Sequence, residues 1–121
     1  MASSTNGFGS LSRRRSHFAK HGAEVGASDA EDYERLADKL LGSVKPPEVH
    51  ECKRRKGDLV RYDPRTEVFG VVDGAGVIRT YFKPVPCSKV PFHLRATAKR
   101  RGECHGFFSN LHYFQAECKK W

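Results

Sequence analysis

Hydrophobic positions in the first 48 residues recur at helical spacing. Residues 29–41 carry one apolar stripe spaced i, i+3, i+4, i+7 and i+8, which predicts a helix. Ser28 and Glu31 match a capping box, so the helix is expected to begin just after Ser28. Gly42 is expected to end it. A shorter helix is predicted over residues 12–21, before Gly22.

After Pro47 the hydrophobic pattern changes to a period of two. The strand-like runs are 49–54, 58–62, 67–72 and 77–83, and Gly-, Asp- and Pro-containing turns separate them. Their starts lie about nine residues apart, which is typical of an antiparallel meander. The predicted fold class is therefore α+β: N-terminal helices packed on a small, twisted antiparallel sheet of about four strands.

The remaining segments complete the expected domain organisation. Residues 1–11 are rich in Ser, Gly and Asn, so they are predicted to be a flexible leader. Residues 12–121 then form a single domain, with helices over 12–42 and the sheet over 49–86. Its last part, 87–121, combines an exposed basic loop with an aromatic segment that can form a closing strand or a short helix.

Composition excludes several classes of protein. The chain has 121 residues, 38% hydrophobic and 11% aromatic, which is too aromatic for a fully disordered chain. No run approaches the roughly 18 apolar residues of a membrane span. The N-terminus lacks an apolar h-region, so no conventional signal peptide is expected.

The net charge of +8 lies entirely in the second half. Residues 1–50 hold 7 Lys+Arg and 7 Asp+Glu, whereas residues 51–121 hold 15 and 7. A field of this sign favours a phosphate backbone or an acidic protein partner. It also fits a basic surface that serves only solubility, and charge alone does not separate these alternatives.

The four cysteines have no Cys-x-x-Cys spacing. Cys104, His105 and Cys118 could ligate a metal only with unusual spacing, and two disulfides would require an oxidising compartment. Without a signal peptide, reduced thiols are expected. No cofactor and no metal are predicted.

The densest cluster of reactive side chains is His17, Lys20 and His21. On a helix the two imidazoles lie one turn apart on one face, and Lys20 borders that face. Imidazoles exchange protons near neutral pH, and an ammonium suits a phosphate oxygen. The alternative is a pair of solvated histidines on a basic helix.

A second cluster occupies the last predicted strand. Strand alternation places Arg79, Tyr81 and Lys83 on one face, and the other face then carries Ile78, Thr80 and Phe82. The polar row offers cations for phosphate and a ring for a base. The alternative is an amphipathic strand with its polar face in water.

Together the two clusters fit RNA cleavage without a metal, by attack of the ribose 2′-OH on the adjacent phosphate.

Motifs in residues 16–86 resemble a known family. His-Phe-Ala-Lys-His-Gly, Arg-Tyr-Asp and Ile-Arg-Thr-Tyr-Phe-Lys-Pro are similar to C-terminal ribonuclease domains of bacterial polymorphic toxins. These belong to the barnase–EndoU–colicin–RelE-like superfamily (the BECR fold), which includes tRNA-cleaving domains of contact-dependent inhibition effectors. Val25 stands where the family pattern has Phe, and the stretch after Cys87 has no counterpart.

The resemblance implies an endoribonuclease toxin domain over residues 12–121 that cleaves tRNA or other structured RNA in interbacterial competition. It implies delivery into the target-cell cytoplasm as the tip of a larger effector and neutralisation by a cognate acidic immunity protein. The domain itself is expected to be a monomer. The expected catalytic residues are His17, Lys20, His21, Arg79, Thr80 and Tyr81. The expected substrate contacts are Lys83, Arg61, Lys53 and Tyr113. A non-catalytic, basic nucleic-acid-binding module is the alternative.

Overall fold

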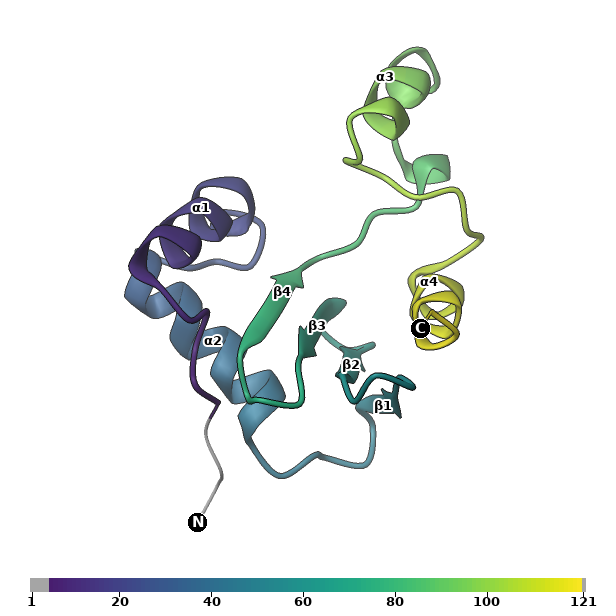
Figure 1. Cartoon of the computed structure of the whole chain (residues 1–121). Helices are drawn as coiled ribbons and strands as arrows, with labels where there is room; N and C mark the ends of the chain where they lie inside the picture. Colours follow the sequence, from purple (N-terminus) through teal and green to yellow (C-terminus); the bar gives the residue numbers. More distant parts are fainter. Residues whose placement is uncertain (1–4, 121) are drawn as a thin grey trace.

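The computed structural model describes residues 5–120 and has the α+β architecture (Figure 1). Two N-terminal helices precede a four-stranded sheet, and short helices follow it. The helices are α1 (Leu11–His21), α2 (Ala30–Gly42), α3 (Arg95–Arg100) and α4 (Asn110–Cys118), with 3-10 turns η1 (Cys87–Lys89) and η2 (Phe92–Leu94). The strands are β1 (His50–Lys53), β2 (Leu59–Asp63), β3 (Val68–Val72) and β4 (Ile78–Phe82).

The sheet is an antiparallel meander in the order β1-β2-β3-β4. Each strand begins and ends within one residue of its predicted limits, because Gly- and Asp-containing turns separate runs of β-branched and aromatic residues. In the last turn, the Asp73 carboxylate accepts from the amides of Ala75 and Val77, both at 3.0 Å. Gly76 adopts a φ of +84°, which side-chain-bearing residues rarely adopt.

The N-cap of helix α2 lies one residue later than predicted. The N-cap is Asp29, whose carboxylate accepts from the Asp32 amide at 2.7 Å. The Asp32 carboxylate in turn accepts from the Ser28 amide at 2.9 Å. The predicted pairing of Ser28 with Glu31 is therefore wrong: Asp29 caps the helix and Asp32 accepts from the amide before the cap. Both carboxylates suit the positive end of the helix dipole.

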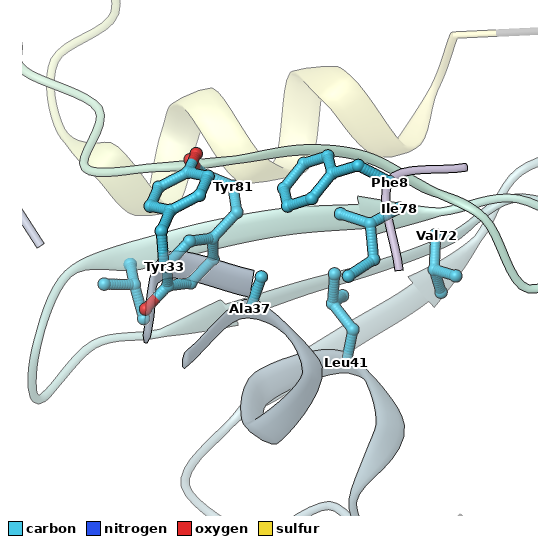
Figure 2. Packing of buried hydrophobic residues seen from close by; sticks show 8 residues of the cluster. Phe8, Tyr33, Ala37, Leu41, Val72, Ile78 and Tyr81 are labelled. Atoms are coloured by element: carbon cyan, nitrogen blue, oxygen red, sulfur yellow. The ribbon is translucent and has the colours of Figure 1, made fainter. Parts of the chain in front are cut away.

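Hydrophobic clusters cover both faces of the sheet. On one face, α2 packs Tyr33, Ala37 and Leu41 against the strands (Figure 2). On the other face, Phe114 of α4 packs against the inner strands β2 and β3. The C-terminal segment, for which a strand or a helix was expected, thus forms a helix that closes the second core.

Residues 5–10 are part of the fold and do not behave as the flexible leader predicted for 1–11; residues 1–4 lie outside the described part of the chain. Phe8 is fully buried in the α2-side core. The Asn6 amide donates to the Gly76 carbonyl at 2.7 Å, and the Ile78 amide donates to the Gly7 carbonyl at 2.7 Å. One aromatic side chain therefore anchors a segment whose composition otherwise suggests mobility.

The cysteines form two disulfides, Cys52–Cys118 and Cys87–Cys104, and no cysteine is free in the part of the chain described. The expectation of reduced thiols is wrong in this structure, because folding brings residues 66 and 17 positions apart to within bonding distance. A metal site of Cys104, His105 and Cys118 is excluded here, since the two sulfurs are bonded to different partners.

The basic stretch 88–106, predicted to be a loop, contains η1, η2 and α3. In residues 5–120 no helix combines the length and the apolar character needed to cross a membrane.

Candidate functional site

Helix α1 holds the first cluster of candidate residues beside the edge strand β4. The Ser10 hydroxyl caps the helix by accepting from the Arg13 amide at 3.1 Å, and the helix ends before Gly22. No acidic residue lies in its first turn, and its last turn is basic. Helix α1 contacts both α2 and the edge strand β4 (Figure 1).

His17 is half-buried and carries a shifted pKa. Its ring stacks on Phe8 with centroids 4.9 Å apart. Among residues 5–120, its buried Nδ1 has no hydrogen-bond partner, so Nε2 is the nitrogen left for exchange with a substrate. Burial lowers the pKa of His17 below 6.5, and the positive charges of His21, Lys20, Arg13 and Arg79 lower it further. The imidazole is therefore mainly neutral at pH 7, as a general base requires.

The second histidine, His21, connects α1 with the end of β4. Its Nδ1 lies 3.2 Å from a Glu24 carboxylate oxygen, and its ring lies 5.3 Å from the Phe82 ring. The other Glu24 oxygen accepts from the Lys83 amide at 2.8 Å. Glu24 thus orients the imidazole and ties it to the strand, which leaves Nε2 of His21 as its proton-exchanging atom.

A β-bulge directs Arg79 out of the β3–β4 ladder. Thr80 pairs with Val71 and Ile78 pairs with Val72, so Arg79 has no opposite residue. Its guanidinium is half-exposed and lies 3.8 Å from the Asp73 carboxylate. Its strand contacts helix α1, and its positive charge is one of those that lower the pKa of His17. Thr80, the next residue, is half-buried.

The same bulge overturns the predicted faces of β4. Ile78 and Tyr81 both pack in the α2-side core (Figure 2). Phe82, in contrast, belongs to the opposite core. Tyr81 is only 4% exposed, and burial, with the nearby Asp63, raises its pKa to about 12. Its carbonyl accepts from the Tyr33 hydroxyl. Tyr81 is therefore a core residue in this structure, and the exposed row of Arg79, Tyr81 and Lys83 does not form.

The four predicted substrate contacts lie in different surroundings. Lys83 is exposed beside Glu24. Lys53 lies on β1, at the opposite edge of the sheet, about 14 Å from β4 by strand spacing. Tyr113 packs on Phe69 and Phe82, and burial raises its pKa.

Arg61, the remaining predicted contact, is buried and binds the protein itself. Its guanidinium donates to Glu51 at 2.8 Å and to the carbonyls of Leu40 and Ser43 at 3.0 and 2.7 Å. These carbonyls belong to the C-terminal end of α2, where a cation is favourable. We therefore assign Arg61 to the fold rather than to the substrate.

Two residues that position the candidate site did not stand out in the sequence: Phe8 and Glu24. Phe8 lies in a stretch of small polar residues and Glu24 in a Gly-rich loop, so neither belongs to a periodic pattern. A single large aromatic residue inside a polar leader was the one available signal for Phe8.

No known family matches the sequence, and no curated protein matches it significantly. Among solved structures, the chain is similar to a ribonuclease from Escherichia coli complexed with its inhibitor protein. The TM-score is 0.47 and the sequence identity 16%, over 69% of this chain and 95% of that chain. The assignment of chemistry to residues depends on the geometry described above.

Proposed function

We propose that the protein is a metal-independent endoribonuclease toxin. The observation that carries this proposal is the packing of helix α1, which holds His17 and His21, against the edge strand β4, whose bulge carries Arg79. A neutral imidazole, a second imidazole and a cation are the groups that cleavage through the ribose 2′-OH needs.

In the proposed reaction, Nε2 of His17 removes the proton of the 2′-OH, and the resulting oxygen attacks the adjacent phosphorus. The Arg79 guanidinium and the Lys20 ammonium stabilise the negative charge of the phosphorane. The bond from phosphorus to the 5′-oxygen then breaks, and His21 supplies the proton that this oxygen takes up. The products are a 2′,3′-cyclic phosphate and a free 5′-OH. We assign Thr80, the residue that follows Arg79, to contact a phosphate oxygen.

The biological role is proposed from the sequence resemblance. The domain would be delivered into the cytoplasm of a competing cell, would cleave tRNA or another structured RNA there, and would be neutralised by an acidic immunity protein. The net charge of +8 suits both partners, since RNA and an acidic protein carry negative charge.

The direct test is incubation of the purified protein with total bacterial RNA in the presence of a chelator, followed by mapping of the cut ends. We expect new ends that carry 2′,3′-cyclic phosphate on one side and 5′-OH on the other. Salt-dependent binding without any new RNA ends would contradict the enzyme and favour the nucleic-acid-binding module.

The lowered pKa of His17 is testable by NMR titration of the histidine ring protons. We expect a midpoint below 6.5, which Lys20→Gln raises because one positive charge is removed. If His17 is the base, the acidic limb of kcat/KM follows the same midpoint, since protonation below the pKa removes the acceptor. Arg65→Gln removes a positive charge that does not act on His17, so the midpoint should stay unchanged in that control.

A further inference from the structure

The segment between β4 and α4 forms an arm that stands apart from the sheet and from the N-terminal helices (Figure 1). We define the basic arm as residues 87–104. The Cys87–Cys104 disulfide joins its two ends. Just outside it, Pro86 pairs with His105, and the Cys87 amide donates to the His105 carbonyl at 2.8 Å. Helix α3 contacts the two 3-10 turns of the same arm. The arm is therefore clipped at its root and projects outward.

The charge of the basic arm is almost entirely positive. It contains five Lys and Arg residues and one Glu. Lys99, Arg100 and Arg101 lie together at the end of α3 and are exposed. Among the described residues, no carboxylate lies within ion-pair distance of these three. Three uncompensated cations in succession suit a phosphate backbone.

Exposed aromatic rings accompany these cations. Phe92 is 81% exposed within the arm, and Phe108, just beyond it, is 87% exposed. The Arg95 guanidinium lies 5.5 Å from the Phe92 ring centre and donates to the carbonyls of Val90 and Ser88 at 2.8 and 2.9 Å. These bonds hold the arm's turn and its ring in place. An exposed ring beside a cation is an arrangement on which unpaired bases stack.

A row of ring contacts connects the arm's root to the candidate cleavage site. The His105 ring stacks on Tyr113 at 4.7 Å, Tyr113 lies 6.2 Å from Phe82, and Phe82 lies 5.3 Å from His21. His105 is held rigidly: Nδ1 accepts from the Phe107 amide at 3.2 Å, and Nε2 bonds the Asn110 side-chain oxygen at 2.8 Å. With both nitrogens engaged, the ring offers packing surface rather than acid–base chemistry.

We infer that the basic arm, with Phe108, is a second RNA-binding surface that grips an unpaired segment of the substrate beside the scissile bond. This inference rests on the proposed ribonuclease function. In this inference the cations bind phosphates and the rings stack on bases. The row of ring contacts from His105 to His21 connects this surface to the site of cleavage. Exposed rings require unstacked bases, so the arm selects loops and single-stranded ends over duplex RNA.

The charge part of the inference is tested with the variant Lys99→Gln/Arg100→Gln/Arg101→Gln. The probe is a fluorescent single-stranded oligoribonucleotide of about 20 nucleotides, and anisotropy gives its affinity over a range of salt concentrations. We expect the negative slope of the logarithm of the association constant against the logarithm of salt concentration to become shallower by about 2. This corresponds to about 0.7 for each lost phosphate contact. The matched control, Arg35→Gln/Lys39→Gln/Arg65→Gln, removes the same charge around α2. An equal change of slope in the control variant would overturn the inference.

The ring part is tested with Phe92→Leu/Phe108→Leu, which keeps the apolar character but removes the aromatic faces. We expect about tenfold weaker binding of the single strand and an unchanged affinity for a blunt duplex of equal length. Because both side chains are exposed, thermal unfolding should not change. Equal losses for strand and duplex would contradict base stacking.

The two proposals are separated by the length of the substrate. A dinucleoside monophosphate has one phosphate, which occupies the cleavage site alone, so the arm variants should cleave it at the wild-type rate. With a long RNA they should show a raised KM and an unchanged kcat. RNA binding that depends on the arm, without any cleavage, would contradict the proposed ribonuclease function but support the arm as an RNA-binding surface. If the arm variants cleave long RNA with the wild-type KM, the arm is not an RNA-binding surface. Binding of an acidic protein by the arm, with no binding of RNA, would contradict the inference in the same way.

Discussion

His17→Gln is expected to slow RNA cleavage by about 10²- to 10⁴-fold, the range typical for loss of a general base. Glutamine fills most of the space on the Phe8 ring, so the substitution removes proton transfer with little change in packing. The free energy of unfolding should therefore stay close to that of the wild type. Rates are measured with a dinucleoside monophosphate, so that substrate binding outside the cleavage site does not enter.

Arg79→Ala should cost about 10²- to 10³-fold in kcat, because it removes the cation that stabilises the phosphorane. Arg79→Lys should recover part of the rate, since the charge remains but the paired N–H donors are lost. The matched control for both positions is His50→Ala, an exposed histidine on β1 at the opposite edge of the sheet. Wild-type rates in both His17→Gln and Arg79→Ala would refute this assignment of the site.

The regular part of the fold followed from local patterns. The stripe in residues 29–41 and the alternation after Pro47 located α2 and the four strands, because spacing and turn residues act over short distances. The expectation that His17 and Arg79 would meet was of a different kind. It came from chemistry and resemblance; the structure packs their two elements, α1 and β4, against each other, and the meeting of the two side chains stays a prediction.

What could not be predicted depends on contacts between distant segments. A bulge inserts one residue into β4 at Arg79, and this shift moved Tyr81 from the expected polar row into the core. No local pattern announces such a bulge. Likewise, the burial of Phe8 depends on Tyr33, which is 25 positions away, and the choice of a helix for 110–118 depends on the open face of the sheet.

The Cys52–Cys118 disulfide is expected to contribute about 4 kcal/mol to the free energy of unfolding, from the loop that a separation of 66 residues closes in the unfolded chain. The double variant Cys52→Ala/Cys118→Ala should therefore unfold at a clearly lower urea concentration. A reducing agent breaks both disulfides, so it should lower the midpoint of the wild type at least as far. Unfolding is monitored by circular dichroism during a urea titration, with tyrosine fluorescence as a second probe.

The control is Cys87→Ala/Cys104→Ala, which removes the clip of the basic arm. Its separation of 17 residues predicts about 3 kcal/mol if only the unfolded chain gains freedom. However, the arm belongs to neither core, so without its clip it also gains freedom in the native state, and the net loss should be much smaller. In contrast, α4 stays fixed without Cys118, because the Arg54 guanidinium still binds Glu117 at 2.8 Å and Phe114 remains buried. The native state then gains little freedom, so nearly the whole entropy gained by the unfolded chain lowers the free energy of unfolding. Equal urea midpoints for the two double variants would contradict this difference between a core cross-link and an arm clip.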